Sequence, residues 1–330
     1  MTERALIVTA HGGPEVLAVQ PRPMPEPGPG ELAVRVEAVG VNFIDVYYRE
    51  GRYPGPAPFV LASEAAGAVS ALGEGVEGAG EAAFGVGDRV AWAMVSGAAA
   101  TTAIVPADKV VPVPDSVTSE QAAAAMLQGM TAHYLSHDTF PVKAGDWALV
   151  HAAAGGVGQL LTQLVVARGG RVVATAGTDD KCEIARSRGA EVTIDYSEVD
   201  DLAAAVREAT GGRGVDVAYD GVGAATFDAS LDSLRPRGMM VLYGAASGAV
   251  PPFDLQRLNS GGSLFVTRPS LAHYIATHAE LQHRATEVLA AVAEGSLQLA
   301  IGGRWSLEDA ADAYRALESR STTGKLLLIP

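Results

Sequence analysis

The stretch WALVHAAAGGVGQLLTQLVVARGGRVVATAGTDDK, residues 147–181, decides the fold of this chain. Residues 147–150 form an apolar run that is too short for a helix and suits a buried strand. A turn of small residues follows at 153–158, and apolar residues then recur at spacings of three and four from Leu160, which indicates a helix. A second apolar run lies at 172–175. This order predicts a βαβ unit whose tight turn opens the helix.

The turn matches the fingerprint G-x-G-x-x-G, with Ala153 in the first position and Gly155 and Gly158 in the others. Gly155 allows a pyrophosphate to approach the backbone, and Gly158 allows the helix to pack closely on the strand. The free N–H groups and the dipole of the helix start favour a negative charge. The alternative is a small-residue turn without a ligand. Because the strands and helix flank the turn in the required order, we favour dinucleotide binding.

Composition and charge narrow the class of protein. The chain has 330 residues, enough for two domains, with 48% hydrophobic and 19% charged residues. A net charge of −14 argues against nucleic-acid and anionic-membrane partners, which need clustered Lys and Arg. The single cysteine, Cys182, excludes an internal disulfide and a Cys-rich zinc site. We find no signal-peptide pattern and no apolar run of about 18 residues, and therefore expect a cytoplasmic protein.

The hydrophobic pattern predicts two kinds of domain. Short strands and turns fill residues 1–124, which we expect to form a mostly antiparallel β domain with a Gly- and Ala-rich loop at 74–87. After an Ala-rich helix at 119–137, strands alternate with helices, which predicts a parallel doubly wound sheet with its ligand beyond the carboxyl ends of the strands. The expected strands of this sheet are 147–150, 172–175, 191–195, 215–219, 239–244 and 264–266. Helices at 278–294 and 307–318 and a strand at 325–329 complete the chain.

Motifs along nearly the whole chain resemble the medium-chain dehydrogenase/reductase superfamily, and most closely its zinc-free NADPH:quinone oxidoreductases, the zeta-crystallin-like group. The matching segments are HGGPEVL (11–17), GVNFIDVYYREGRYP (40–54), GDRVAW (87–92), MLQGMTAHYL (126–135), HAAAGGVG (151–158), YDGVG (219–223), GSLFVTRPSL (262–271) and STTGKLLLIP (321–330). The resemblance implies a GroES-like catalytic domain from 1–124 and 268–330 and a Rossmann NADPH-binding domain from 125–267. It also implies an active site in the cleft between them and a homodimer.

The zinc ligands of related dehydrogenases have no counterparts here. Such relatives carry a Cys or His in three separate segments. In this chain the first position is Asn42, the second segment reads Ala62-Ser63-Glu64, and the third, residues 126–128, has no ligand. A zinc site of the usual kind is therefore excluded by residue identity. A quinone or conjugated enone is electron-poor enough to accept hydride without a Lewis acid, so metal-free redox chemistry fits such acceptors.

The cofactor is expected to be NADPH. The second strand of the βαβ unit ends in Thr175-Ala176-Gly177-Thr178, without the acid that bonds the ribose 2′-OH in NAD sites, and Lys181 follows as a positive charge for a 2′-phosphate. Asp179 and Asp180 would oppose that phosphate if they pointed toward it. The resemblance implies a larger set of cofactor-binding residues: Asn42, Phe43, Asp45, Thr131, Ala154, Gly155, Gly156, Val157, Gly177, Thr178, Lys181, Tyr196, Tyr243, Gly244, Ala245, Arg268 and Arg320.

The resemblance also implies the catalytic positions Tyr47, Tyr53 and Asn42. The two phenols can stack on a flat acceptor and hydrogen-bond its oxygen, although such tyrosines also pack at the rims of cores. An NADPH-dependent enone or 2-alkenal double-bond reductase is the alternative activity. A structural or sensor protein that binds NADPH without turnover is the non-enzymatic alternative, and the net charge opposes RNA binding.

Overall fold

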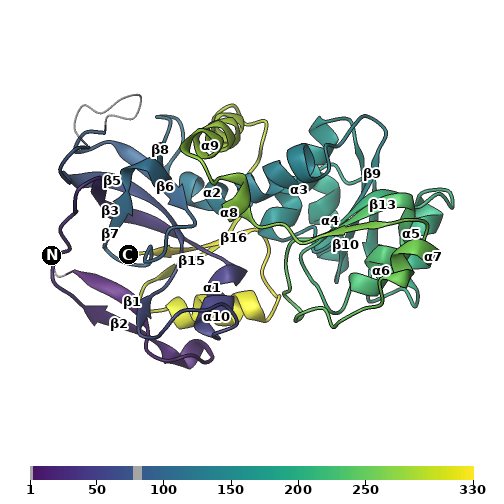
Figure 1. Cartoon of the computed structure of the whole chain (residues 1–330), viewed down its shortest axis with the longest axis horizontal. Helices are drawn as coiled ribbons and strands as arrows, with labels where there is room; N and C mark the ends of the chain where they lie inside the picture. The colour runs from purple at the N-terminus through teal and green to yellow at the C-terminus, as the bar shows by residue number, and fades with distance from the viewer. Residues whose placement is uncertain (1–2, 77–83) are drawn as a thin grey trace. The chain divides into compact units, whose positions relative to one another are not determined.

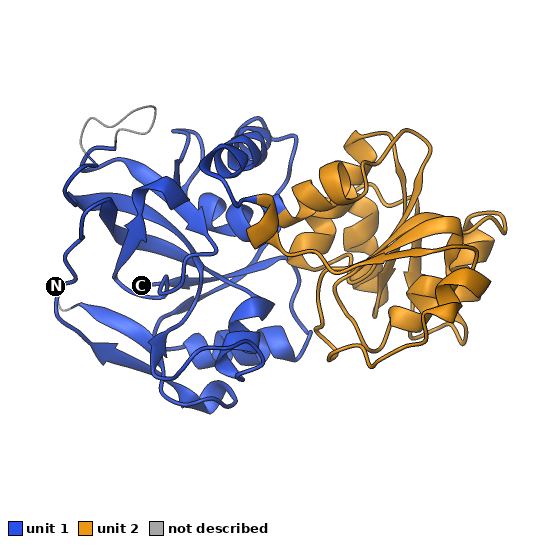
Figure 2. Cartoon of the chain, in the orientation of Figure 1, with its two compact units in different colours: residues 1–130, 275–330 blue, residues 131–274 orange. Residues whose placement is uncertain are grey.

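The computed structural model describes residues 3–76 and 84–330. The chain divides into two compact units, one from Met1–Met130 with Ile275–Pro330 and the other from Thr131–Tyr274 (Figure 2). These boundaries lie a few residues beyond those expected from the sequence. Part of the expected loop at 74–87 lies outside the described residues. Each unit has its own sheet and its own apolar core.

The second unit contains a six-stranded parallel sheet in the order β11-β10-β9-β12-β13-β14. This order is that of a Rossmann fold. The strand order reverses between β9 and β12, and Rossmann folds bind ligands at this switch point. The predicted doubly wound sheet is confirmed. Its strands are β9 (Trp147–Val150), β10 (Arg171–Ala176), β11 (Val192–Asp195), β12 (Val215–Asp220), β13 (Leu234–Leu242) and β14 (Phe265–Thr267).

Helices flank this sheet, with α3 drawn on one side of the strands and α5 and α6 on the other (Figure 1). Helix α3 buries Leu160, Leu161 and Val165, the residues whose spacing predicted it. The helices of this unit are α3 (Gly156–Ala167), α4 (Asp179–Ser187), α5 (Leu202–Ala209), α6 (Phe227–Asp232), α7 (Gln256–Ser260) and α8 (Leu271–Tyr274). Helix α4 was not among the predicted elements because its residues are mostly charged. Its N-cap is Thr178, whose side chain accepts a bond from the Lys181 N–H.

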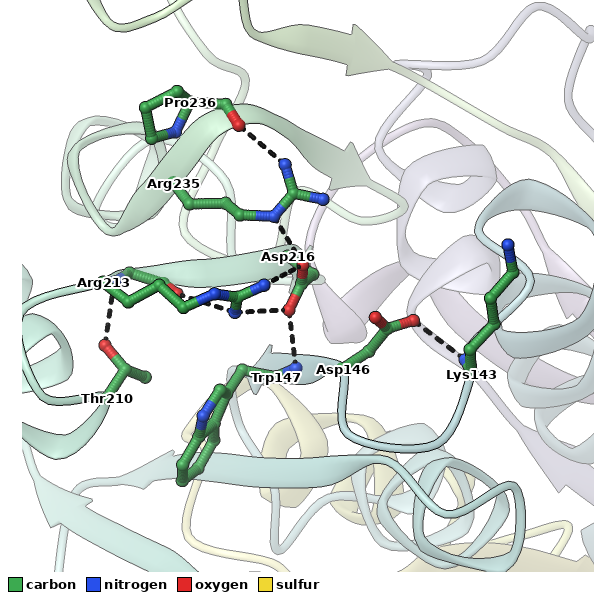
Figure 3. Close-up of polar contacts among 9 residues, drawn as sticks. Lys143, Asp146, Trp147, Thr210, Arg213, Asp216, Arg235 and Pro236 are labelled. Carbon is green, nitrogen blue, oxygen red and sulfur yellow. Dashed lines mark hydrogen bonds and ion pairs between the residues drawn. The ribbon is translucent and has the colours of Figure 1, made fainter.

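A charged cluster fixes the amino-terminal ends of the strands β9 and β12 in this sheet (Figure 3). Asp216 of β12 is buried and accepts bonds from Arg213 at 2.7 Å and from the Trp147 N–H of β9 at 2.8 Å. Arg235, at the start of β13, donates to the same carboxylate at 2.5 Å. Burial opposes the charge of Asp216, but the hydrogen bonds from the two guanidinium groups outweigh it and lower the pKa of this carboxyl. The cluster joins three strands at the end opposite to the carboxyl ends.

The first unit is built from two mostly antiparallel sheets, as expected. One has the order β2-β1-β4 and the other β15-β16-β3-β5-β6-β8, with β7 also paired to β3. The strands are β1 (Arg4–Val8), β2 (Leu17–Pro21), β3 (Glu31–Val41), β4 (Phe59–Val60), β5 (Glu64–Leu72), β6 (Arg89–Ala93), β7 (Thr102–Pro106), β8 (Val110–Pro112), β15 (Ile301–Ser306) and β16 (Lys325–Ile329).

The C-terminal strand β16 pairs antiparallel with β3, so that Leu326 lies opposite Val41. The remaining elements of this unit are η1 (Pro14–Val16), α1 (Phe43–Arg49), η3 (Ala107–Lys109), α9 (His278–Ala293) and α10 (Ala310–Glu318). Helix α2 (Ser119–Tyr134) crosses the unit boundary and continues into the π-helix η4 (Leu135–Thr139). Helix α1 was missed because its seven residues are too few to show a helical period.

Candidate active site

The dinucleotide turn lies where β9 passes into α3. Gly155 is the N-cap of α3, and no side chain caps the helix there, so the first N–H groups are available to a phosphate. A Cβ on Gly158 would lie 2.4 Å from the Ala152 carbonyl oxygen and 2.7 Å from the Ala153 Cα. The close packing expected of Gly158 is therefore present. Ala154, Gly156 and Val157, which the resemblance implied as cofactor-binding residues, lie in the same turn.

The expected 2′-phosphate residues gather where β10 ends. Gly177 follows the strand, Thr178 caps α4, and Lys181 lies in the first turn of that helix. Tyr196 follows β11 and is 49% exposed; its hydroxyl would lie 2.4 Å from a Cβ on Gly177, so a larger residue there would displace the Tyr196 ring. Four predicted residues are thus neighbours around one helix N-terminus. Asp179 and Asp180 are exposed on the same turn.

The loops after β12 and β13 are packed against each other. The Tyr243 and Gly244 N–H groups donate to the Asp220 carbonyl oxygen at 2.9 and 3.3 Å. A Cβ on Gly244 would lie 2.4 Å from the Gly221 carbonyl oxygen. Arg268, which follows β14, donates to the Leu242 carbonyl oxygen at 3.2 Å. Tyr243, Gly244, Ala245 and Arg268 therefore lie at the carboxyl end of the parallel sheet. Their contact with a cofactor stays a prediction.

A buried polar chain supports this end of the sheet. His151, directly after β9, contacts Thr175 Oγ1 at 2.8 Å and Ser230 Oγ at 2.9 Å. Ser230 donates its only hydrogen to Asp220 Oδ2 at 2.8 Å. The His151 Nε2 must therefore donate to Ser230, and in the neutral ring Nδ1 accepts from Thr175. Burial lowers the pKa of His151, with Asp220 opposing the shift, so the neutral ring is favoured.

Asp220 is the anchor of that chain. Its second oxygen, Oδ1, accepts the Val222 and Gly223 N–H groups at 2.7 and 2.9 Å, and Oδ2 also accepts from Thr226 at 2.7 Å. A fully buried carboxylate is stable only with such donors. The array fixes the 220–226 loop relative to the phosphate turn.

In the first unit, Asn42 precedes α1 and is 4% exposed. Its Nδ2 donates to the Gly40 carbonyl oxygen at 3.1 Å and to Glu64 Oε2 at 2.7 Å. Its Oδ1 accepts from Lys325 Nζ at 2.7 Å and from Gln128 Nε2 at 3.4 Å. Both hydrogens and both lone pairs of this amide are thus used by the protein. A bond from Asn42 to the cofactor, as expected from the sequence, would require one of these bonds to open.

Asp45 and Tyr314 extend the same buried network. Asp45 Oδ2 accepts the Asn42 N–H at 2.8 Å and the Tyr314 hydroxyl at 3.0 Å. Burial raises the pKa of Asp45 to about 7, while the bond from Asn42, the bond from Tyr314 and the charge of Lys325 act in the opposite direction. Burial and the neighbouring Asp45 raise the pKa of Tyr314 well above its usual value. Asp45 is therefore an internal group rather than a contact at the surface of the site.

The two tyrosines expected at the acceptor site lie together. The rings of Tyr47 and Tyr53 are 5.5 Å apart and meet edge to face, and Tyr48 packs against Tyr53 at 5.4 Å. Phe43 lies 6.5 Å from Tyr47. Tyr47 is 7% exposed and Tyr53 is half-buried. Edge-to-face aromatic contacts of this kind hold rings in place.

Arg49 and His11 brace the segment that carries Tyr53. The buried Arg49 guanidinium pairs with Glu318 of α10 at 2.7 and 3.1 Å and donates to the Gly12 carbonyl oxygen at 3.0 Å. His11 contacts the carbonyl oxygens of Arg49 and Gly55 at 3.3 and 3.0 Å.

Arg320 lies just beyond α10 with a left-handed backbone (φ 57°), and Thr131 is buried on α2.

Sequence reasoning missed several polar residues of both networks. Asp220, His151 and Lys325 lay inside quoted motifs, but nothing local showed what they contact. Glu64 was noted only because the residue before it is not His. A charged residue within an apolar run, as in Lys325-Leu326-Leu327-Leu328, is a usable signal because an unpaired buried charge is costly.

Two protein families match parts of this chain. Residues 28–115 match the alcohol dehydrogenase GroES-like domain, and residues 156–294 match the zinc-binding dehydrogenase family. The chain belongs to the medium-chain dehydrogenase/reductase superfamily. Its relatives include quinone oxidoreductases: the one from Pseudomonas aeruginosa is 43% identical, over 97% of this chain and 98% of the relative.

Two further relatives bear on the site. A mycobacterial protein solved in complex with NADPH is 50% identical, with a TM-score of 0.95 and full coverage of both chains. A 2-haloacrylate reductase from a Burkholderia species is 40% identical, over 99% of this chain and 98% of that protein. Across residues 3–76 and 84–330, no cluster of three or more His, Cys, Asp or Glu side chains is arranged to hold a metal. Within the same ranges, no helix is long and apolar enough to cross a membrane.

Proposed function

We propose that this protein is an NADPH-dependent quinone oxidoreductase that works without a metal ion. The observation that carries this is the uncapped N-terminus of α3 at the point where the parallel sheet reverses its order, with Gly158 packed on the Ala152 carbonyl. The named activity of the Pseudomonas relative and the NADPH complex of the mycobacterial relative support it.

The described residues fit a dinucleotide phosphate. The N–H groups of Ala154, Gly156 and Val157 would hold the pyrophosphate, because no side chain caps α3, while the Gly155 N–H donates to the Ala152 carbonyl oxygen at 2.9 Å and shapes the turn. Lys181, Tyr196 and the N-terminus of α4 would hold the 2′-phosphate of the adenosine, with Gly177 leaving room. For the nicotinamide end we propose Thr131, Tyr243, Gly244, Ala245 and Arg268, and from the first unit Phe43. Arg320 of the first unit would contribute to the site of the adenosine phosphate. Asn42 and Asp45 would act indirectly, through the buried hydrogen-bond network that they share.

When bound, NADPH supplies a hydride to an electron-poor conjugated acceptor. Tyr47 and Tyr53 would orient that acceptor by ring contact and by hydrogen bonds from their hydroxyls, held in place by Phe43 and Tyr48. A hydroquinone oxygen can take its proton from water, so no side chain is required as an acid. Catalysis then consists mainly of positioning.

A double-bond reductase acting on enones, 2-alkenals or acrylates is the second candidate, and the 2-haloacrylate reductase among the relatives favours it. Steady-state oxidation of NADPH should be measured with 1,4-benzoquinone, 1,4-naphthoquinone, 2-alkenals and 2-chloroacrylate on one preparation. We expect the quinones to give the highest kcat/KM. Turnover of only the alkenals or acrylate would assign the second function. Tight binding of NADPH with no turnover of any acceptor would indicate a sensor or structural protein.

The choice of cofactor is tested at Lys181. Lys181→Gln should weaken NADPH binding about tenfold, equivalent to ~1.4 kcal/mol, and leave NADH binding unchanged, because only NADPH carries the 2′-phosphate. Separate titrations with NADPH and with NADH, each followed by the fluorescence of the reduced nicotinamide, measure the two dissociation constants. Lys143→Gln, at an exposed lysine of the same unit, is the matched control. An equal loss for NADPH and NADH would place Lys181 away from the 2′-phosphate.

We further propose that the protein is a cytoplasmic homodimer. Strand β14 ends the six-stranded sheet and pairs only with β13 among the described strands. Its Phe265 is 56% exposed, unusual for a large apolar side chain on a strand. An unpaired edge strand with an exposed aromatic side chain suits pairing with a second copy.

A further inference from the structure

The three segments in which zinc-dependent relatives carry their ligands do come together in this structure, but around a lysine. Asn42 follows β3, Glu64 begins β5, and Leu127 and Gln128 lie on α2. The Lys325 ammonium, from β16, bonds Glu64 Oε2 and lies 2.7 Å from Asn42 Oδ1. The Leu127 N–H bonds the other Glu64 oxygen, Oε1. We call Asn42, Glu64, Gln128 and Lys325 the cage.

The cage does not fit a zinc ion, although the family matched by residues 156–294 is described as zinc-binding. Zinc in proteins is bound by Cys, His and carboxylate groups, and two of the cage side chains are neutral amides. The one carboxylate, Glu64, already accepts bonds from Lys325, Asn42 and the Leu127 N–H. An ammonium in contact with the same oxygen repels a dication.

The surroundings show that a positive charge is required at this point. The Glu64 and Lys325 side chains are 0% and 2% exposed, and Asp45 is 1% exposed. Other charged or titratable groups facing the network are Tyr314, Arg49 and Glu318, of which Arg49 and Glu318 pair with each other. Without Lys325, Glu64 would be a buried carboxylate with only amide donors. A buried pair that loses one partner is strongly destabilised.

The cage is also closely packed. A Cβ on Gly40 would lie 2.1 Å from Glu64 Oε2 and 2.8 Å from the Ala123 carbonyl oxygen, so Glu64 occupies the space of a side chain at position 40. An ammonium can only donate hydrogen bonds. Lys325 therefore fixes the Asn42 amide with Oδ1 toward the ammonium and Nδ2 toward Glu64. Asn42 is the residue from which α1 starts, and α1 carries Tyr47.

We propose that the Lys325 ammonium is a built-in cation that takes the place of a metal ion in this cage, and that Lys325 is a positioning residue for Asn42 and the start of α1. The cation is covalently part of the chain and is supplied by a strand hydrogen-bonded to β3. The amide and carboxylate groups of the cage are thereby held in one arrangement without a bound ion.

The first test is a double-mutant cycle on stability. Lys325→Met, close in shape but uncharged, should lower the melting temperature at pH 8 by about 10 °C. Much of this loss should be recovered in Lys325→Met/Glu64→Gln at pH 8, because that variant no longer has an unpaired buried carboxylate at position 64. Lys109→Met is the control, because Lys109 forms an exposed pair with Asp108 at 3.7 Å.

Two results would overturn the proposal. One is a Lys325→Met protein as stable at pH 8 as Lys109→Met. The other is a failure of Glu64→Gln to restore the Lys325→Met protein. If Lys325→Met does not fold at pH 8, the double variant decides, since a folded double variant supports the charge argument and an unfolded one contradicts it.

The second test uses Co²⁺ alone as a probe on wild-type protein. We expect visible absorbance and calorimetry to show no stoichiometric binding of Co²⁺ that is present in wild type and absent in Glu64→Gln. One equivalent of Co²⁺ bound to wild type and lost in Glu64→Gln would show a metal site instead of a built-in cation.

The third test concerns positioning and rests on the proposed function. With 1,4-benzoquinone at pH 8, Lys325→Met should lower kcat more than tenfold, while the dissociation constant of NADPH changes less than about threefold. A fall in NADPH affinity that accounts for the whole loss would contradict positioning. If wild type reduces no quinone, the proposed function fails, and the stability and Co²⁺ tests still decide the role of Lys325.

Discussion

Asn42 and His151 are both buried polar residues that follow a strand, and their partners give each a defined orientation. The Asn42 amide has all four hydrogen-bonding positions filled, and its direction is fixed because Lys325 only donates. The His151 ring has its tautomer fixed because Ser230 donates its hydrogen to Asp220. Each residue therefore acts on the site through its neighbours. The family resemblance had implied a direct cofactor contact for Asn42.

Asp45 should make stability depend on pH near neutrality. Its folded pKa of about 7 lies above the ordinary value of 3.8, so the native state retains a proton that the unfolded chain has lost between these values. Stability then falls as pH rises from about 4 to about 7, by at most ~1.4 kcal/mol per pH unit. Asp45→Asn should flatten this part of the curve in urea unfolding. Parallel curves for Asp45→Asn and wild type would contradict the assignment.

A matched control for that experiment is Asp228→Asn. Asp228 pairs with Arg257 at 2.7 Å but its side chain is 75% exposed. Exposed pairs contribute little, so this variant should follow the wild-type curve within about 0.5 kcal/mol.

At the scale of elements, the junction of β9 and α3 depends on the absence of a side chain at Gly158. Gly158→Ala would place a methyl group against backbone atoms at 2.4 and 2.7 Å, which cannot move as a flexible side chain does. We expect a loss of about 1–3 kcal/mol in urea unfolding and weaker NADPH binding. Gly85→Ala, whose Cβ would meet nothing closer than 3.7 Å, should change neither quantity. Unchanged NADPH affinity in Gly158→Ala would show that the turn can relax.

The Asp216 cluster should hold the opposite end of the sheet. Asp216→Asn leaves two guanidinium groups without their carboxylate (Figure 3) and should cost about 1–3 kcal/mol at pH 7. Because the folded pKa of Asp216 is lowered, its contribution is present above the ordinary pKa and disappears as pH falls through the folded value. The deficit of Asp216→Asn should therefore shrink in acid. A deficit that is constant from pH 7 to pH 3 would contradict an ionic origin.

At the scale of the whole molecule, the edge position of strand β14 predicts that two copies of the chain form a dimer. Phe265→Asp should convert the proposed dimer to a monomer in analytical ultracentrifugation, because a charge at the edge opposes strand pairing. Leu255→Asp, at a residue 69% exposed elsewhere in the same unit, should leave the dimer intact. A Phe265→Asp dimer would place the interface elsewhere, and a monomeric wild type would remove the proposal.

Much of the fold followed from local pattern. The βαβ unit, the parallel strands and the antiparallel N-terminal part were predicted because buried strands and helices leave short periods in the sequence. Short or polar elements were missed, as α1 and α4 show, because seven or nine residues with many charges carry no clear period. The cofactor turn was predicted with its glycines because its role depends on consecutive residues.

The sequence by itself determined the two kinds of domain, the dinucleotide turn and the absence of the usual zinc ligands, all of which depend on neighbouring residues or on residue identity. Only the tertiary structure decided what stands in the place of those ligands. Lys325 and Asn42 are 283 residues apart and meet because β16 pairs with β3. Hydrogen bonds and buried charges act over a few ångströms, and which distant residues share those few ångströms is set by the folded chain alone.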